Sequence, residues 1–137
     1  MDGLRVNKTA YLLDTHALIF WNNKENVSRE FIEYFDDIDQ KGLLFVSSIT
    51  FWEIALLNKN KRLEISNLFI WKSDIFDNTN LQILNPSAKE MIDSTLLSNI
   101  HKDPFDRLLI AQAKHNNLQI VTKDKNIHKY KINVFWM

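Results

Sequence analysis

The chain has 137 residues, of which 45% are hydrophobic and 12% aromatic, as expected for one globular domain with a substantial core. Its 17 basic and 17 acidic side chains balance, which argues against a protein that coats nucleic acid through bulk charge. The chain contains no cysteine, so disulfides, zinc–thiolate sites and cysteine nucleophiles are excluded. We expect a single domain over residues 1–137, with residues 1–9 as a flexible N-terminal arm.

Five short apolar runs rich in β-forming residues predict the strands of a sheet. In chain order they are Tyr11–Leu13, Leu43–Val46, Leu81–Leu84, Leu118–Val121 and Ile132–Phe135. Segments with helical spacing lie between most of these strands: one begins near His16, and the others are Ser28–Gln40, Ile49–Asn58, Asn67–Phe76, Ser87–Ser98 and Pro104–Asn116. The alternation predicts an α/β fold in which helices cover both faces of a parallel sheet.

Acidic residues recur where ligands bind in such folds, beyond the carboxyl ends of the strands. Asp14 follows the first predicted strand, Glu53 lies on the helix after the second, and Asp124 comes just after the fourth. The predicted helix Ser87–Ser98 reverses the chain direction, which returns Asp106 to the same edge of the sheet. We therefore expect the four acids to meet.

The segment Asp103-Pro104-Phe105-Asp106 predicts the start of a helix. Proline suits the first helical position, because the amide that it lacks would be unpaired there. Asp103 is then the N-cap and Asp106 the third helical residue, and the positive end of the helix favours the ionised form of both. Asp103 is interpreted as a cap first and as a candidate site residue second.

Each of the four acids also has a purely structural explanation. Asp14 can cap the helix that follows it, and Thr50 with Glu53 matches a capping box. Asp106 is favoured by the helix dipole, and Asp124 fits a surface turn. Four acids at one end of a sheet are harder to explain as caps alone, so they are taken as the candidate site.

Three neighbouring polar residues are secondary candidates beside Asp103. Thr122 could bond a metal-bound water or be an ordinary threonine at a strand end. His16 could contact a phosphate or transfer a proton, although a hydrogen-bonded structural histidine is the favoured interpretation. Arg107 could pair with a carboxylate or a phosphate, or form a surface ion pair. Spacing predicts no role for His101, and the four tryptophans are interpreted as core or interface residues.

Taken together, the motifs resemble those of PIN-domain ribonucleases, in particular VapC-type toxins of type II toxin–antitoxin systems. The resemblance spans Leu12 to Trp136, and its carriers are Leu13-Asp14-Thr15-His16-Ala17-Leu18, Ser48–Ala55, His101–Ala113 and Val121–Asp124. It implies a three-layer α/β/α sandwich around a parallel sheet of about five strands. It also implies that Asp14, Glu53, Asp106 and Asp124 are the four active-site acids, with Asp103 as an additional acid.

The implied function is endonucleolytic cleavage of RNA. Clustered carboxylates without cysteine favour Mg²⁺ or Mn²⁺ over Zn²⁺, with Asp14, Asp106 and Asp124 as ligands and Glu53 as a ligand or as the residue that orients the water. A cognate antitoxin and a homodimer are implied partners. No apolar run approaches the ~20 residues that span a bilayer, and the polar N-terminus lacks a signal peptide's hydrophobic region, so we expect a cytoplasmic protein without membrane association.

Two other functions remain as alternatives. One is a non-catalytic PIN-type scaffold that binds RNA or protein, although such a scaffold has no need of four mutually repelling acids. The other is a haloacid-dehalogenase-like phosphatase, which is disfavoured because His16 stands where that chemistry needs a second aspartate.

Overall fold

The computed structural model describes residues 8–130 and 132–137, so most of the expected N-terminal arm lies outside the described residues. The elements follow in the order β1 (Tyr11–Leu13), α1 (Thr15–Asn23), α2 (Arg29–Gln40), β2 (Leu44–Ser47), α3 (Ser48–Lys59), α4 (Leu68–Asn78), β3 (Gln82–Leu84), α5 (Ala88–Thr95), α6 (Pro104–Asn116), β4 (Gln119–Val121), a 3₁₀ turn (Ile127–Lys129) and β5 (Val134–Phe135).

The strands form one five-stranded sheet in the order β3-β2-β1-β4-β5, and every neighbouring pair is parallel. Strand β1 lies at the centre, where Leu12 faces Phe45 on one side and Ile120 on the other. This arrangement confirms the predicted α/β fold and its strand number. The first strand has its predicted bounds, and the other four differ from prediction by one or two residues at one or both ends.

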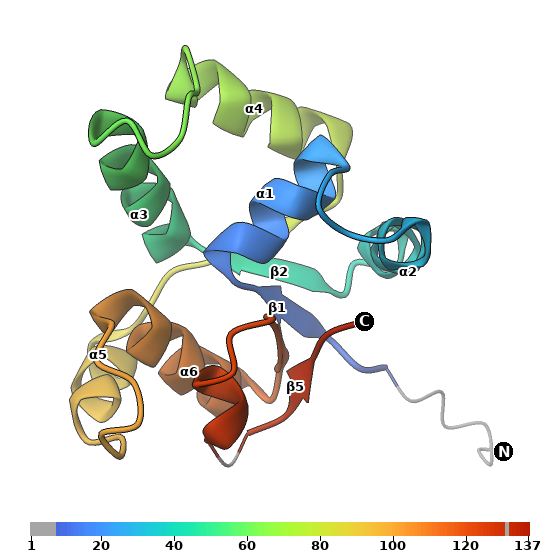
Figure 1. The fold of residues 1–137 in the computed structure, drawn as a ribbon. Helices are drawn as coiled ribbons and strands as arrows, with labels where there is room; N and C mark the ends of the chain where they lie inside the picture. Colours follow the sequence, from blue (N-terminus) through green and yellow to red (C-terminus); the bar gives the residue numbers. More distant parts are fainter. Residues whose placement is uncertain (1–7, 131) are drawn as a thin grey trace, which may run out of the picture.

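Helices cover both faces of the sheet, which makes three layers (Figure 1). Tyr11 and Leu13 of β1 pack into a core cluster with residues of α1, α2, α3 and α4. Leu12 points the other way and packs against Leu109 and Ile110 of α6. All three β1 side chains are therefore buried, as a strand covered on both faces requires. Within the described part of the chain, no helix combines the length and the hydrophobicity needed to cross a bilayer.

Differences from the sequence prediction in two helices, α3 and α5, bear on the candidate site. Helix α3 is capped by Ser47, whose hydroxyl accepts a hydrogen bond from the amide of Ile49. The capping box suggested for Thr50 and Glu53 is therefore wrong, because the helix begins two residues earlier than Thr50. Helix α5 ends at Thr95 rather than at Ser98, and the loop that follows it runs to Asp103.

Candidate metal centre

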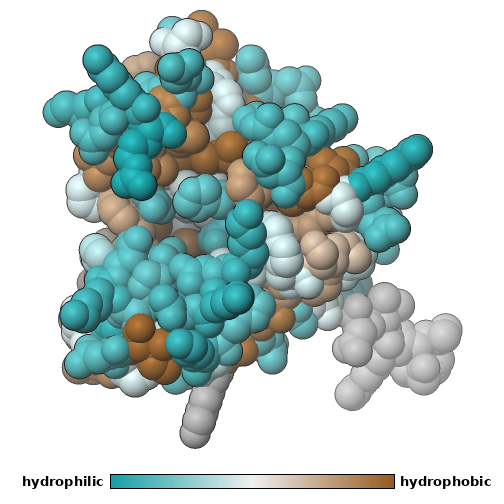
Figure 2. All heavy atoms as spheres, viewed as in Figure 1, coloured by the Kyte–Doolittle hydropathy of each residue, from teal (hydrophilic) through white to brown (hydrophobic). Residues whose placement is uncertain are grey.

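The structure brings the four acids of the sequence analysis to one cleft at the carboxyl ends of the central strands. Asp14 follows β1, Glu53 lies in the second turn of α3, and Asp106 lies in the first turn of α6. Asp124 follows β4. The cleft has a volume of about 620 Å³, and its lining comprises Asp14, Thr15, His16, Phe20, Glu53, His101, Asp103, Asp106, Lys123 and Asp124. In Figure 2 the molecule is hollowed between the part formed by α1 and α3 and the part formed by α5 and α6.

Asp14 is both a helix cap and a wall of this cleft. Its Oδ1 accepts a hydrogen bond of 2.8 Å from the amide of Ala17, in the first turn of α1. Burial raises the pKa of Asp14, and hydrogen bonds from Thr122 and Ala17 only partly oppose that rise. The structural and functional explanations of Asp14 are therefore compatible, since one oxygen can cap the helix while the carboxylate faces the cleft.

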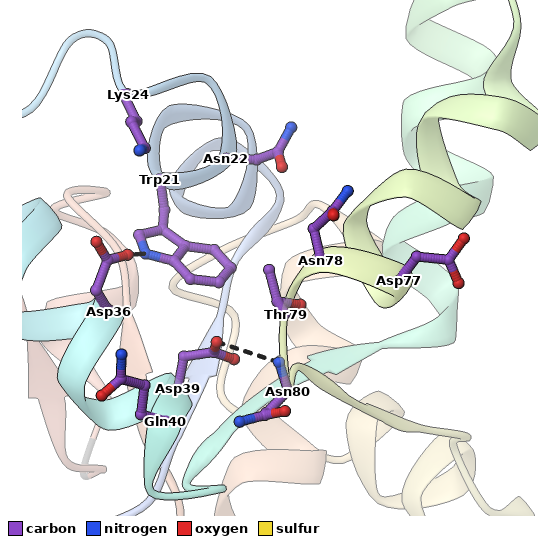
Figure 3. Close-up of a pocket in the computed structure, with 10 residues that line it drawn as sticks. All are labelled: Trp21, Asn22, Lys24, Asp36, Asp39, Gln40, Asp77, Asn78, Thr79 and Asn80. Atoms are coloured by element: carbon purple, nitrogen blue, oxygen red, sulfur yellow. Dashed lines mark hydrogen bonds between the residues drawn. The ribbon is translucent and has the colours of Figure 1, made fainter.

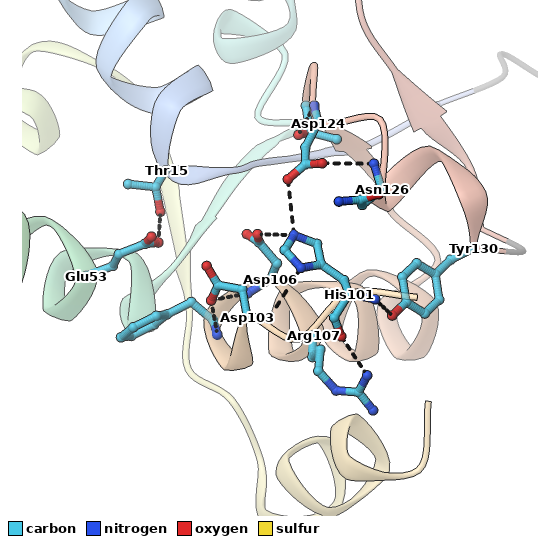
Figure 4. A network of polar contacts seen from close by, with 11 residues as sticks. Thr15, Glu53, His101, Asp103, Asp106, Arg107, Asp124, Asn126 and Tyr130 are labelled. Atoms are coloured by element: carbon cyan, nitrogen blue, oxygen red, sulfur yellow. Dashed lines mark hydrogen bonds and ion pairs between the residues drawn. The ribbon is translucent and has the colours of Figure 1, made fainter. Parts of the chain in front are cut away.

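Glu53 is held by a side chain of the neighbouring helix α1. The hydroxyl of Thr15, the first residue of α1, donates a hydrogen bond of 2.5 Å to Glu53 Oε1 (Figure 4). Because Ser47 caps α3, Glu53 is not engaged at the helix start and projects from the second turn instead. The contact joins α1 to α3 at the cleft.

His101 joins the remaining two acids, and the sequence analysis missed it. Its Nε2 lies 2.8 Å from Asp106 Oδ2 and 3.1 Å from Asp124 Oδ2 (Figure 4). One ligand-type atom from each of these three residues lies within 4.8 Å of the other two. His101 is five residues from Asp106 and 23 from Asp124, so no sequence period could have signalled the cluster.

The carboxyl group of Asp106 is strongly perturbed by its surroundings. Burial, followed by the negative charge of Asp103, raises its pKa to about 7. His101 opposes the rise, while Asp14 and Glu53 add to it. A carboxylate with this surplus of negative charge around it is a strong candidate for binding a cation.

Asp103 takes the position predicted for it. It is the N-cap of α6, and its Oδ1 accepts hydrogen bonds from the amides of Phe105 and Asp106, at 2.8 and 3.4 Å. Pro104 is the first helical residue, and Asp106 is the third. Asp103 also lines the cleft, so its carboxylate contributes negative charge there while it caps the helix.

Among residues 8–130 and 132–137, Arg107 has no acidic partner, and it is not a lining residue of the cleft. Its guanidinium donates hydrogen bonds to four backbone carbonyls at the end of α5 and in the loop after it, those of Ser94, Leu97, Ser98 and His101. In Figure 4 it points away from the acids. The suggested pairing of Arg107 with a carboxylate or a phosphate is therefore not seen, because its donors are engaged by the main chain.

The other secondary candidates lie in or beside the cleft. Thr122 is fully buried, and its hydroxyl accepts from the amide of Asp124 at 3.0 Å. His16 is exposed and lines the cleft, and no hydrogen bond of its ring is seen within the described residues, which disfavours the structural explanation. Lys123 was not among the candidate site residues, but its ammonium lies 5.0 Å from the centre of the Phe20 ring, at the wall of the cleft.

The tryptophans divide between the core and the surface. Trp21 is buried and belongs to the core, as interpreted from the sequence. Trp52, next to Glu53, is 59% exposed, so it is not a core residue. Its ring packs edge-on against Phe105, with 5.2 Å between the ring centres. Trp52 is exposed and Phe105 half-buried, and each is next in sequence to an acid that lines the cleft, Glu53 and Asp106 respectively.

A second acid-lined cavity lies near the opposite ends of the strands. Its volume is about 540 Å³, and Asp36, Asp39 and Asp77 are among its lining residues (Figure 3). Asp36 accepts a hydrogen bond from the Trp21 indole at 2.9 Å, and Asp39 accepts one from the amide of Asn80 at 3.1 Å. These contacts link α2 to α1 and to the start of β3, which gives two of the three acids a structural role.

The donor set of the first cleft fits a hard divalent cation. Carboxylate oxygens are the ligands that Mg²⁺ and Mn²⁺ prefer, and a thiolate, which would favour a softer metal, is excluded by the lack of cysteine. Asp106 and Asp124 already present oxygens within reach of one ion, and Asp14 lies in the same cleft. The cleft is therefore the candidate metal centre.

Comparisons with known proteins point to one family. The sequence model of the PIN domain matches residues 11–133. Ribonuclease VapC22 of Mycobacterium tuberculosis is 25% identical over 128 residues, which cover 90% of this chain and 93% of that protein. The fold is similar to that of VapBC2 from Rickettsia felis bound to a DNA fragment from their promoter (TM-score 0.69, 19% identity, 93% of this chain and 98% of that one). It is also similar to that of a toxin–antitoxin complex from Klebsiella pneumoniae (TM-score 0.62, 19% identity, 93% and 97%).

Proposed function

The chain belongs to the PIN-domain family, and from this membership we propose that it is a metal-dependent endoribonuclease, the toxin of a toxin–antitoxin pair. Its substrate is RNA, and its reaction is hydrolysis of a phosphodiester bond. The similarity to a protein named as a ribonuclease supports the activity. The solved VapBC and toxin–antitoxin complexes with the same fold support the biological role.

The meeting of the acids in one cleft carries this proposal. Residues from four separate places in the sequence supply Asp14, Glu53, Asp106 and Asp124 to a cleft of about 620 Å³. Burying Asp106 and surrounding it with other carboxylates disfavours its ionised form, and these effects raise its pKa to about 7. A protein that only needed a stable fold would gain from neutral side chains at these positions.

We assign the side chains to roles by their places in the cleft. Asp14, Asp106 and Asp124 hold Mg²⁺ or Mn²⁺, and Glu53, fixed by the Thr15 hydroxyl, orients the attacking water. When bound, the cation neutralises the carboxylates, polarises the scissile phosphate and acidifies a water molecule. Lys123 and His16, at the wall of the cleft, face the incoming phosphodiester, and the Lys123 ammonium offsets part of the negative charge that would repel it.

The partners follow from the proposed role. We propose a cognate antitoxin that covers the acidic cleft, and a homodimer of the toxin. Apolar side chains exposed on two parts of the surface support protein contacts: Trp52, Leu56, Phe69 and Ile70 on α3 and α4, and Met91 and Ile92 on α5 with Leu96 just after it. Because the substrate is RNA, we place the protein in the cytoplasm.

The decisive experiment is an RNA cleavage assay with purified protein and Mg²⁺ or Mn²⁺. We expect cleavage with either ion, loss of cleavage in excess EDTA, and loss in Asp14→Asn and Asp106→Asn, which remove a charged ligand but keep the shape of the side chain. Asp37→Asn is the matched control, because Asp37 is exposed and pairs with Lys41 on α2. It should cleave like the wild type.

Two outcomes would overturn the proposal. Cleavage that survives EDTA or either substitution excludes the metal mechanism. A protein that binds the metal and RNA but leaves the RNA intact is instead a non-catalytic PIN-type scaffold. The toxin role is tested separately, by expression in a responsive host with and without the product of a small neighbouring gene.

A further inference from the structure

His101 occupies the centre of the acidic cluster although none of the proposed catalytic roles requires it. Its Nε2 contacts Asp106 Oδ2 at 2.8 Å and Asp124 Oδ2 at 3.1 Å (Figure 4). The side chain is only 14% exposed. Two explanations fit these distances: the imidazole is itself a metal ligand, or it donates a hydrogen bond to two carboxylates that hold the metal.

The other ring nitrogen decides between the two explanations. Nδ1 accepts a hydrogen bond from the amide of Asp103 at 3.3 Å, so it carries no proton. A neutral imidazole then carries its proton on Nε2, which makes Nε2 a donor to Asp106 and Asp124. A metal bound at Nε2 would require the opposite tautomer, with an N–H on Nδ1 facing the amide N–H of Asp103. The hydrogen bonds therefore favour a donor over a ligand.

The main chain around His101 is held from both sides. Its amide donates to the Tyr130 hydroxyl at 2.9 Å, and its carbonyl accepts from Arg107 at 2.9 Å. The Tyr130 hydroxyl also donates to the carbonyl of Ser98, and Tyr130 is buried. Arg107 bonds three further carbonyls at the end of α5 and in the loop after it. An ordinary surface loop does not need so many side-chain hydrogen bonds to its main chain. Together these hydrogen bonds fix the position of the His101 imidazole.

We propose that His101 is a positioning residue of the metal centre: its Nε2–H holds the carboxylates of Asp106 and Asp124 at the spacing that one divalent cation needs. The Arg107 and Tyr130 contacts keep it there. This inference rests on the proposed function only in taking these two acids as metal ligands. The imidazole lowers the repulsion between the two carboxylates, so less of the binding free energy of the cation is spent on bringing them together.

The expected effect is on metal affinity. Hydrogen-bond partners of metal-ligating carboxylates typically change affinity by ~10–100-fold when they are removed. We therefore expect His101→Ala to weaken Mn²⁺ binding by about that factor. His101→Gln restores an N–H donor near the position of Nε2 and should recover much of the affinity. His115→Ala is the matched control, since His115 lies exposed at the far end of α6, and it should bind like the wild type.

The test uses titration calorimetry with Mn²⁺ on the wild type and the three variants, without RNA. Thermal unfolding of each metal-free protein shows whether a variant is folded. Tyr130→Phe removes one support of the His101 main chain without touching an acid, and should weaken binding by a smaller factor than His101→Ala. Pulsed electron paramagnetic resonance of bound Mn²⁺ reports directly whether a nitrogen atom coordinates the ion, and we expect no such coupling.

Each result bears on one proposal or the other. Mn²⁺ affinity that is unchanged or higher in His101→Ala overturns the positioning role. A ¹⁴N coupling in the wild type that disappears in His101→Ala shows that the imidazole is a ligand, and also overturns it. A wild-type protein that binds no Mn²⁺ contradicts the proposed function itself. Weaker binding in folded His101→Ala, with rescue by glutamine and no ¹⁴N coupling, supports the inference.

Discussion

Asp106 links the stability of the protein to pH in a direction opposite to that of most carboxyl groups. Its pKa of about 7 lies above the usual value of ~3.9, so between these values the folded protein binds more protons than the unfolded chain. The free energy of unfolding therefore falls as the pH rises from about 4 to about 7. The pKa of Asp14 is also raised, and it acts in the same direction.

Asp106→Asn should therefore stabilise the metal-free protein at pH 8 while abolishing its activity. One pKa unit corresponds to ~1.4 kcal/mol, and because the carboxylate is partly solvated we expect a gain of about 2 kcal/mol. The gain should shrink towards pH 4, where the wild-type carboxyl is protonated. Thermal unfolding over this pH range, in EDTA, measures it.

The Asp106→Asn variant should also differ from the wild type in its response to metal. Added Mn²⁺ should stabilise the wild type at pH 8 but have much less effect on Asp106→Asn, since the variant lacks one proposed ligand. The amide oxygen can still accept from His101, so the histidine contact is retained. If Asp106→Asn is less stable than the wild type at pH 8 without metal, the ionised Asp106 carboxylate does not destabilise the folded protein, and the prediction is wrong.

Two acids at the start of helix α6, three residues apart in the sequence, have different roles. Asp103 accepts from two amides at the start of the helix, whereas Asp106 points to His101 in the cleft. We expect Asp103→Ala to destabilise the protein by about 1 kcal/mol through loss of the cap. Asp103→Ser keeps a capping oxygen and should restore most of this stability, which denaturant unfolding can measure.

The serine variant also tests whether Asp103 binds the metal. Its negative charge raises the pKa of Asp106, so Asp103→Ser should lower that pKa while Mn²⁺ still binds. Loss of Mn²⁺ binding in a stable Asp103→Ser protein would make Asp103 a ligand rather than a cap.

Local signals allowed the elements of the fold to be predicted from the sequence. Alternating apolar runs and helical periods depend on residues close in the chain, and they predicted all five strands and the helices between them. The error at Thr50 and Glu53 had a local cause as well: Ser47 and Ser48 come shortly before Thr50 and can also cap a helix, and Ser47 is the cap in the structure. Which of these residues caps the helix depends on where α3 begins in the folded protein, and the local sequence does not determine that.

Part of the candidate site could be predicted from the sequence, because three of its acids follow predicted strands. Asp14, Glu53 and Asp124 follow strands, so the parallel sheet alone brings them to one edge. His101 and Arg107 belong to the contacts between a loop and the helix after it, which depend on where α5 ends. Because that end was placed three residues too late, the loop that positions His101 was not foreseen.

At the scale of the whole molecule, the candidate metal centre joins the two halves of the sandwich. Asp14 caps α1, which packs in the core on one face of the sheet, and Asp106 lies in the first turn of α6, which packs on the other. Glu53 and Thr15 meet on the α1 side, whereas His101 and Asp124 meet on the α6 side. A cation shared between Asp14 and Asp106 would therefore tie one layer to the other through the cleft.

Metal binding should consequently stabilise the molecule as a whole and protect both walls of the cleft. At a free Mn²⁺ concentration of 100 times its dissociation constant, the free energy of unfolding should rise by about 2.7 kcal/mol. Hydrogen exchange should slow in residues 14–17, 103–107 and 122–126 together, with a smaller change in the edge strands β3 and β5. Protection confined to the α6 side would mean that Asp14 does not share the cation, and Asp14→Asn should then bind Mn²⁺ as tightly as the wild type. If both walls are protected in the wild type and neither is in Asp14→Asn, the cation joins the two layers.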